Sequence, residues 1–336
     1  MEPLVFEPCL RPQVWGGQRL AHFGKDLPGG ATLIGESWEL SGHPLHVSHV
    51  ASGPCAGRTL SELWARQREA IVGPRYHGPD RFPLLIKLLN CEEPLSVQVH
   101  PGDADSKRLG LADPGKCEAW VVLETSENSR LDAGLQEGVD RAELEHRLRE
   151  GSVDECLNHL TPEVGDCLYL PSGTVHSARG GVVLVEVQPA SDSTFRLFDW
   201  NRLDTSGHAR PLHREKGLSV VDWSLGPLGF VVSATTLPLA TGATITQLLS
   251  TSKFELNRYD IKRAYSPKNL VGRMVSWVVI DGEVTLQSAA STQTLTLSRG
   301  HTVLVPASAG AVEWTPTGKS ASLLAVTLGR EFEAEA

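Results

Sequence analysis

Four polar side chains in the sequence have types and spacings that could hold a metal ion: Gln98, His100, Glu118 and His176. Gln98 and His100 are two positions apart, so in a strand both side chains project from the same face. Glu118 lies in an apolar run, where an unpaired carboxylate is costly to bury. Two imidazoles, a carboxylate and an amide oxygen suit zinc, with manganese or iron as further options, and leave room for water or a substrate oxygen.

Each of these residues also has a structural explanation when taken alone. A single histidine in a strand is more often a core or surface residue than a metal ligand, and Gln98 by itself is typical of a solvated strand position. The metal-binding hypothesis therefore needs support from another part of the sequence.

Two segments of the chain recur in degenerate form. Residues 165–176 are echoed by residues 300–311, and in both copies a glycine precedes a proline by six positions. Residues 117–123 are echoed by residues 274–280, with a tryptophan at the same place. Recurrence of this apolar frame predicts two copies of one β unit.

The polar residues do not recur with that frame. Glu118 corresponds to Val275, and His176 corresponds to Ala311. If the glutamate and the histidine served folding alone, the second copy should need them as well. Their restriction to the first copy favours a functional role.

Short apolar runs must position these residues. The 32 glycines and 21 prolines punctuate runs rich in Val, Leu, Ile and Thr, which is typical of the strands of a sandwich or barrel. Asp281-Gly282, between residues 276–280 and 284–286, predicts a hairpin with a type I′ turn. The sequence therefore predicts a mainly β fold.

Helical signals are few and local. Thr59 and Glu62 have the spacing of a capping box that opens a helix. A second helix is predicted from Asp140 to Glu150, with Gly151 as its stop, and a third from Ser152 to Leu160. The last two indicate a helical insertion between strands.

Composition excludes several classes of protein. The chain has 336 residues and a net charge of −9, with no Lys/Arg block, so we expect no nucleic-acid partner. The N-terminal residues do not resemble a signal peptide, and no apolar run is long enough to cross a bilayer, so we expect no membrane partner. Six scattered cysteines without a Cys-x-x-Cys pair indicate reduced thiols, and hence a cytoplasmic protein.

Residues 165–176 resemble the second conserved motif of the cupins, Gly-x5-Pro-x-Gly-x2-His. A wider set of segments resembles the type I mannose-6-phosphate isomerases in the compact form found in many bacteria. These segments occur in family order over roughly the first two thirds of the chain: Val14-Trp15-Gly16-Gly17, Gly35 to Ser41, Phe82 to Lys87, Leu95 to Pro101, Gly115 to Trp120, Pro171 to His176 and Asp192 to Asp199.

The resemblance implies a fold and a division of the chain. The fold it implies is a cupin-type jelly roll or β-barrel with a helical insertion, followed by a second, smaller cupin-like β domain. Residues 1–230 would form the catalytic, metal-binding domain, with the insertion at about residues 138–160. Residues 238–330 would form the C-terminal domain, which lacks metal ligands.

The resemblance also implies an activity, the interconversion of mannose 6-phosphate and fructose 6-phosphate with one zinc or other divalent ion per chain. Its metal ligands fall on His100, Glu118 and His176, with Gln98 as the fourth. Its active-site arginine falls on Arg196. The acidic and basic positions of the same pocket fall on Glu186, Asp192, Lys87 and Lys116. One departure is Cys117, where many relatives carry Thr or Pro.

The residue types suit an aldose–ketose isomerisation, which moves a proton between C1 and C2 through an enediol(ate). Arg196 does not readily give up its proton, so we assign it to oxyanion or phosphate binding. Lys87, Lys116 and Asp192 are candidates for binding the substrate and its phosphate. Lys116 is also a candidate catalytic residue, with Arg196 and Glu186. Glu186 lies in an apolar strand that should raise its pKa, so it is our proton shuttle. A buried salt bridge between Glu186 and Arg196 is an alternative.

Two other functions fit parts of the same pattern. One is another metal-dependent cupin enzyme, such as an oxygenase, which would not need the cations Lys87, Lys116 and Arg196. The other is a non-enzymatic sugar-phosphate sensor, which would not need the metal ligands.

His43, His46 and His49 recur every third residue, but Pro44 opposes a helix, so we expect a solvated loop. The sequence makes no prediction of oligomeric state.

Overall fold

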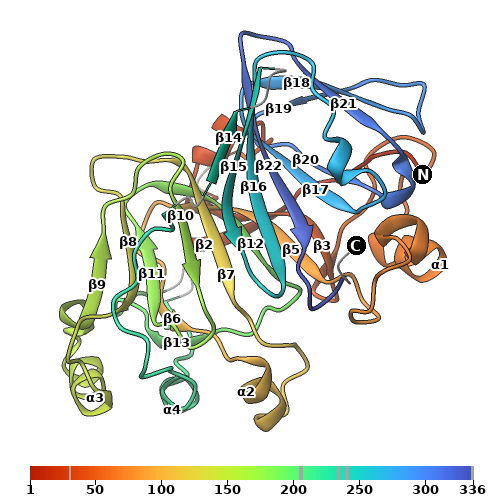
Figure 1. Ribbon diagram of the computed structural model, residues 1–336. Coiled ribbons are helices and arrows are strands. Elements are labelled where there is room, and N and C mark those ends of the chain that lie inside the picture. The colour runs from red at the N-terminus through yellow and green to blue at the C-terminus, as the bar shows by residue number, and fades with distance from the viewer. Residues whose placement is uncertain (30–31, 204–206, 233–234, 239–241, 334–336) are drawn as a thin grey trace.

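The computed structural model describes residues 1–29, 32–203, 207–232, 235–238 and 242–333, and it consists mainly of β-strands (Figure 1). A sheet in the order β10-β7-β12-β5-β3-β2, with β4 on β3, and a sheet in the order β13-β6-β11-β8-β9 form the N-terminal sheet pair. Its strands are β2 Cys9–Gly17, β3 Ile34–His43, β4 His46–Val47, β5 Leu84–Cys91, β6 Val97–Val99, β7 Glu118–Glu124, β8 Arg130–Leu135, β9 Leu157–Leu160, β10 Cys167–Leu170, β11 His176–Arg179, β12 Val182–Pro189 and β13 Phe195–Phe198.

A sheet in the order β1-β20-β17-β22-β16-β15-β14 and a sheet in the order β19-β18-β21 form the C-terminal sheet pair. Its strands are β14 Thr235–Pro238, β15 Ala243–Ser250, β16 Phe254–Ile261, β17 Val275–Asp281, β18 Glu283–Ser288, β19 Leu295–Ser298, β20 Thr302–Val305, β21 Val312–Pro316, β22 Ala321–Leu328 and the N-terminal β1 Leu4–Val5. The predicted mainly β architecture is confirmed. The predicted boundary between the two domains stays a prediction. Strand β1 belongs to the N-terminal part of the chain but pairs with β20 of the C-terminal sheet pair, and residues 233 and 234 of the linker lie outside the described residues.

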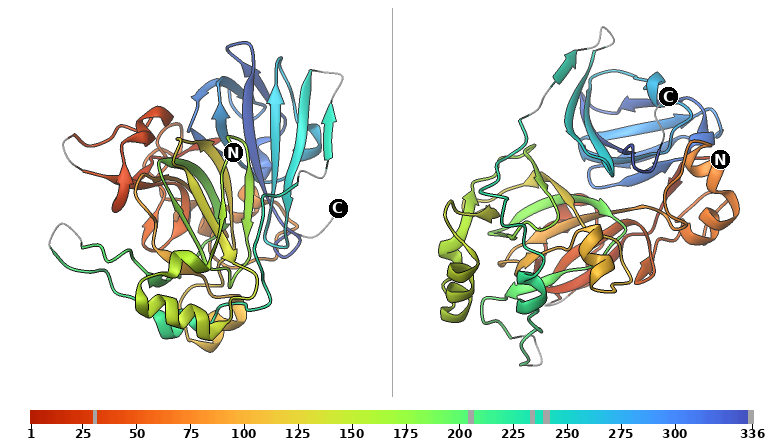
Figure 2. Two further views of the ribbon diagram at one scale, coloured as in Figure 1. Left: turned by 90° about the vertical axis from the view of Figure 1, so that its left-hand side faces the viewer. Right: turned by 60° about the horizontal axis from the view of Figure 1, so that its bottom comes forward.

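The helices lie around the sheets. They are α1 Leu60–Val72, α2 Asp103–Arg108, α3 Arg141–Glu150, α4 Arg214–Leu218 and four short 3₁₀ turns, Arg19–Phe23, Val153–Cys156, Lys268–Leu270 and Ala307–Ala309. The predicted capping box opens α1, since Thr59 accepts from the Glu62 amide and Glu62 accepts from the Thr59 amide. Helices α3 and α4 lie at the end of the N-terminal sheet pair that is remote from the C-terminal sheet pair (Figure 2).

The internal repeat is real in three dimensions. Trp120 on β7 faces Leu168 on one neighbouring strand and Glu186 on the other. Trp277 on β17 occupies the same position, between Val303 and Ala325. The two sheet pairs are therefore two copies of one strand arrangement, as the sequence predicts.

The large sheets of the two pairs share one core and are buried on both faces. In β12, Val183, Val185 and Val187 pack in the same apolar cluster as Leu324 and Val326 of β22. Intervening residues of β12 point instead into the N-terminal sheet pair, because side chains alternate along a strand. Two-sided burial explains why these strands read as continuous apolar runs in the sequence.

Three local expectations are wrong. Asp281-Gly282 does not close a hairpin, because β17 pairs with β20 and β22 while β18 pairs with β19 and β21. Only Gly282 of the two has a positive φ, and a type I′ turn needs both. Residues 152–160 form a 3₁₀ turn followed by β9 rather than a helix. His43 lies in β3, where its side chain is buried rather than solvated.

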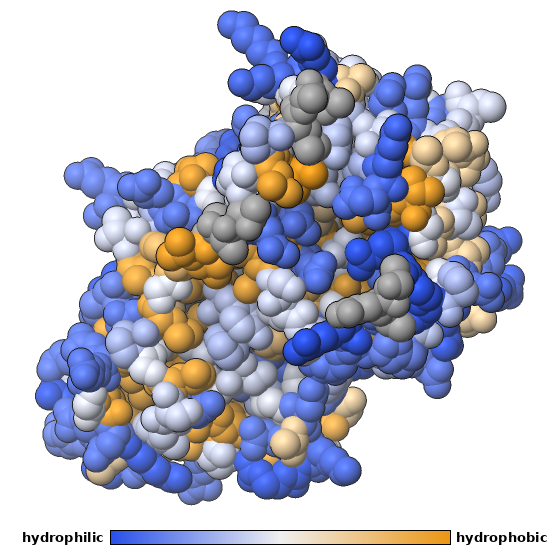
Figure 3. Space-filling view, in the orientation of Figure 1, coloured by the Kyte–Doolittle hydropathy of each residue, from blue (hydrophilic) through white to orange (hydrophobic). Residues whose placement is uncertain are grey.

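The surface view of the same orientation shows hydrophilic residues over much of the rim and hydrophobic residues in patches nearer the middle (Figure 3). Within the described ranges, no helix combines the length and the apolar character that crossing a bilayer requires.

Candidate metal and active site

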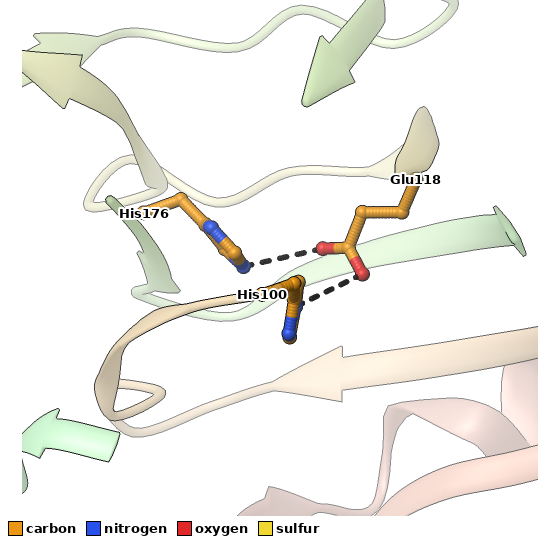
Figure 4. Close-up of side chains that lie close together, drawn as sticks. All are labelled: His100, Glu118 and His176. Atoms are coloured by element: carbon orange, nitrogen blue, oxygen red, sulfur yellow. Dashed lines mark ion pairs between the residues drawn. The ribbon is translucent and has the colours of Figure 1, made fainter. Parts of the chain in front are cut away.

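Three buried side chains meet inside the N-terminal sheet pair (Figure 4). His176 Nε2 lies 3.3 Å from Oε1 of Glu118, and His100 Nε2 lies 3.3 Å from Oε2 of the same carboxylate. The ligand-type atoms of this His–Glu–His trio all lie within 4.8 Å of one another. His100 follows β6, Glu118 begins β7 and His176 begins β11, so elements of both sheets supply the trio. The arrangement can hold a divalent cation.

Backbone carbonyl groups orient both histidines. Nδ1 of His100 donates to the Ser193 oxygen at 3.0 Å, and Nδ1 of His176 donates to the Thr174 oxygen at 2.9 Å. A proton on Nδ1 leaves a lone pair on Nε2, the atom that faces Glu118. In the described part of the chain, His100 Nε2 and both Glu118 oxygens are buried and form no hydrogen bond. Such buried acceptor atoms fit a bound cation.

The local charges favour the protonation states of metal ligands. Burial opposes ionisation of Glu118, but Lys116, with its Nζ 3.1 Å from Oε2, and the histidines hold the pKa of Glu118 well below its usual value. Burial and the charge of Lys116 lower the pKa of His100 to about 3. A charged carboxylate beside a neutral imidazole is the combination that binds a metal ion.

Gln98 lies beside the trio on β6, at the register position opposite His176. Its Nε2 is 3.2 Å from Nε2 of His176, and its Oε1 accepts from Ser96 at 3.3 Å. Gln98 and His100 both contact His176, as expected for residues on one strand face. Its role as a fourth ligand stays a prediction, because the amide nitrogen, and not the oxygen, faces the trio.

A cavity of about 250 Å³, which we call the active-site cavity, is lined by Gln98 and Lys116, and these two residues contact His176 and Glu118 of the trio. Its lining includes all of the remaining predicted site residues together with Gln98: Lys87, Gln98, Lys116, Glu186, Asp192 and Arg196. The structure therefore brings residues from positions 87 to 196 of the chain to one place. Cys117 is not among the lining residues; it is buried in the core shared by the two large sheets.

Lys87 and Glu186 form a buried ion pair across β5 and β12, with Nζ 3.0 Å from Oε1. The second oxygen of Glu186 accepts from Trp120 Nε1 at 3.0 Å. Burial and the charge of Glu118 raise the pKa of Glu186, whereas the carboxylates of Glu186 and Glu36 outweigh burial and raise the pKa of Lys87. The raised pKa predicted for Glu186 is thus present, but its cationic partner is Lys87 and not Arg196.

Arg196 lies on β13, in register with Gln98 on β6. Its Nη1 donates to the Pro211 oxygen at 2.9 Å, and within the described ranges its guanidinium makes no ion pair. Burial and the charge of Arg210 lower the pKa of Arg196. Arg196 therefore presents a cation to the cavity that no carboxylate in the described part of the chain neutralises directly.

Sequence reasoning missed several residues of the site. Arg210 lines the cavity and is held by Asp199, with Nε 2.8 Å from Oδ2. Glu36 and Trp38 also line it, and both occur in a segment that carries the resemblance, which was the available signal. Asp113, which accepts a hydrogen bond from the Asp192 amide at 3.0 Å, lies in a loop without periodicity and gave no signal.

Comparisons with known proteins agree with this geometry. The family model for the catalytic domain of type I phosphomannose isomerase matches residues 4–119. The protein "Mannose-6-phosphate isomerase ManA" of Bacillus subtilis is 38% identical over 221 residues, which is 66% of this chain and 68% of that protein. A mannose-6-phosphate isomerase of Streptococcus mutans is 37% identical over 221 residues, with the same shares.

Solved structures resemble the whole described architecture. The crystal structure of the mannose 6-phosphate isomerase from Bacillus subtilis has a TM-score of 0.87 and 29% identity, covering 98% of this chain and 100% of that chain. A putative mannosephosphate isomerase from Archaeoglobus fulgidus, at 23% identity and a TM-score of 0.76 over 98% and 99% of the two chains, shares the fold. Because its sequence is 38% identical to a curated mannose-6-phosphate isomerase over 68% of that protein, the chain belongs to the type I mannose-6-phosphate isomerase family.

Proposed function

We propose that this enzyme interconverts mannose 6-phosphate and fructose 6-phosphate by moving a proton between C1 and C2 of the open-chain sugar. The observation that carries the proposal is the buried His–Glu–His trio beside a cavity lined by cationic side chains. A metal-dependent oxygenase acting on an uncharged substrate would have no use for these cations, and a simple sensor would have no use for the trio.

We infer that one divalent ion binds to His100, Glu118 and His176, with Gln98 as a fourth ligand once its amide turns to present Oε1. Two imidazoles and one carboxylate, with room for another oxygen, are a donor set of catalytic zinc sites, so zinc is the metal we propose. When bound there, the ion supplies polarisation of the sugar oxygens and compensation of the negative charge that develops on them.

Glu186 is our candidate for the group that carries the proton. Its carboxylate lines the cavity, and its raised pKa brings proton uptake closer to neutrality. In the direction from aldose to ketose, an oxygen of Glu186 takes the proton from C2 and returns it to C1, while the hydroxyl proton of O2 passes to O1. Lys87 and Trp120 hold the two carboxylate oxygens in place.

The cations of the cavity have different roles. Lys87 and Lys116 each lie close to a carboxylate, so their charge is largely compensated. Arg196 has no such partner within the described ranges, and we assign the phosphate, or the developing oxyanion, to it. We assign substrate contacts to Lys116 and Asp192, which both line the cavity, and a catalytic role to Lys116, whose Nζ lies 3.1 Å from Glu118.

The division into a catalytic domain at residues 1–230 and a metal-free domain at residues 238–330 is part of the proposal. It is supported by the ligand trio, which lies entirely in the first part, and by the apolar residues at the equivalent positions of the second. The six cysteines, all unpaired, support a reducing compartment such as the cytoplasm.

A coupled assay of mannose 6-phosphate conversion, with and without a chelator, tests the function. We expect turnover that the chelator abolishes and added zinc restores, and we expect His100→Ala to lose activity by several orders of magnitude. A matched control is His22→Ala, since His22 is an exposed histidine paired with Glu124. Unchanged turnover in His100→Ala would refute the proposal.

A further inference from the structure

The loop between α2 and β7 carries an acidic residue that binds three partners at once. Asp113 accepts from Nε2 of His43 at 3.0 Å, from both terminal nitrogens of Arg81 at 3.2 Å, and from the backbone amide of Asp192 at 3.0 Å. Its side chain is only 16% exposed. Burial opposes its charged form, but these donors hold the pKa of Asp113 below its usual value. We call Asp113, His43 and Arg81 the clamp.

The clamp fixes a short stretch of backbone that follows β12. Besides the Asp113 bond to the Asp192 amide, Arg81 donates to the Ala190 oxygen at 2.7 Å. Ser191 Oγ returns a hydrogen bond to the Pro114 oxygen, beside Asp113, at 2.8 Å. Three hydrogen bonds therefore join the loop and the clamp to residues 190–192.

The same stretch reaches the metal site one residue later. The oxygen of Ser193 accepts from Nδ1 of His100, and this bond directs His100 Nε2 at Glu118. The side chain of Asp192 lines the active-site cavity. A displacement of residues 190–193 would therefore move both a ligand's orienting partner and a cavity wall.

The second histidine of the trio does not depend on the clamp. Nδ1 of His176 donates to the Thr174 oxygen, two residues before it in the same turn. His100 instead relies on a carbonyl group 93 residues away in sequence. The outer contact of His100 must be fixed by tertiary structure, and the clamp is the charged element that fixes it.

We propose that Asp113 is a positioning residue of the enzyme: through the backbone of residues 192–193 it orients His100 for the divalent ion and places Asp192 in the cavity. This inference rests on the metal site of the proposed function. Outer partners of metal ligands typically change metal affinity about 10- to 100-fold when they are removed. Asp113→Asn should therefore bind zinc about 10-fold more weakly than the parent protein, with a larger loss in Asp113→Ala.

The test measures zinc affinity of the full-length apoprotein by competition with a chromophoric chelator, independently of activity. The parent protein, His100→Ala, Asp113→Asn and the double variant form a cycle. Because Asp113 acts through His100, we expect Asp113→Asn to weaken binding in the parent background and to add little once His100 is absent. Asp260→Asn is the control, since Asp260 is another acid paired with an arginine and a hydroxyl, outside the cavity.

The outcomes separate the two ideas. If the parent protein fails to bind zinc, or His100→Ala binds it equally well, the metal site itself is wrong and the positioning role falls with it. If His100→Ala loses affinity but Asp113→Asn binds like the parent, the metal site stands and the positioning role is overturned. Equal losses from Asp113→Asn in both backgrounds also overturn it, because a general structural effect does not depend on His100. With saturating zinc, we expect KM to rise more than kcat falls, since Asp192 lies in the cavity wall.

Discussion

The buried pair Lys87–Glu186 allows a stability prediction of known size. Both side chains are only 4% exposed, and their charged atoms lie 3.0 Å apart. Removing one partner of a buried ion pair leaves an uncompensated charge and typically costs about 3–5 kcal/mol. Lys87→Met strands the Glu186 carboxylate, with the hydrogen bond from Trp120 as its remaining direct partner. We expect Lys87→Met to lower the free energy of unfolding by about 3 kcal/mol or more.

Urea denaturation of the apoprotein at pH 7 measures this loss. With a slope of about 3 kcal/mol per molar urea, such a loss lowers the midpoint by about 1 M. The control is Arg141→Met, which removes an exposed pair with Glu145 on α3 at 2.7 Å. An exposed pair four residues apart on a helix contributes only about 0.3–0.5 kcal/mol. If Lys87→Met shifts the midpoint no more than Arg141→Met does, the reasoning about the buried pair is refuted.

The second sheet pair indicates how the loss can be recovered. In the register of β16, β22 and β17, the equivalents of Lys87 and Glu186 are Asn257 and Ala325, so the same frame folds without the ion pair. Lys87→Met combined with Glu186→Leu should therefore be more stable than Lys87→Met alone. Activity should be lost in the double variant, because Glu186 is the proposed proton carrier.

Three further predictions concern stability. Gly180→Ala should destabilise the protein well beyond the cost of about 1–2 kcal/mol that a positive φ imposes, because a Cβ would collide with the backbone oxygen of Asn128. Gly138→Ala, with a positive φ in open space, is the control in urea denaturation. Arg210 and the other partners of Asp199 lower its pKa in the folded protein despite burial. Its contribution to the free energy of unfolding is therefore complete above the pKa that Asp199 has in the unfolded chain, and is lost as the pH falls through its pKa in the folded protein. The urea midpoints of Asp199→Asn and the parent should converge below about pH 4, and a constant difference would contradict this assignment. Lys253→Met removes the ion pairs of Lys253 with the partly exposed Asp103 and Glu331, and it should lower the free energy of unfolding by about 1 kcal/mol or less in the same urea measurement. A larger loss would contradict the treatment of these contacts as exposed ion pairs.

Much of the fold could be predicted from local signals. Runs of apolar residues bounded by Gly and Pro correspond to β7, β10 and β12, and the capping box at Thr59 marks the start of α1. The hairpin at Asp281-Gly282 was wrong because both flanking runs are strands, yet each pairs within a different sheet. A dipeptide specifies a local turn, whereas the sheet to which each strand belongs depends on distant partners.

Two members of the trio, Glu118 and His176, could be predicted because they stand out against a second copy of the same frame. The predicted partner of Glu186 could not be settled in this way. Lys87 and Arg196 are both basic and both line the cavity, and only the strand register places Lys87 opposite Glu186 on β5. His43 was wrongly assigned to a solvated loop, because the partner that fixes its side chain, Asp113, lies 70 residues away in sequence. Long-range pairing of this kind leaves no periodic trace in a sequence.

The two sheet pairs together support our proposal that Lys87 and Glu186 of the first serve function rather than folding. At the register positions of Lys87 and Glu186, the C-terminal sheet pair has Asn257 and Ala325, and Trp277 Nε1 is left without the acceptor that Glu186 provides for Trp120. Among the described residues, the frame thus tolerates a tryptophan with an unpartnered N–H and has no charge at these two positions. We therefore expect the double variant Lys87→Asn and Glu186→Ala, which introduces the residues of the second copy, to fold but to lose isomerase turnover. Failure of this variant to fold would show that the two charges serve the stability of the N-terminal sheet pair itself.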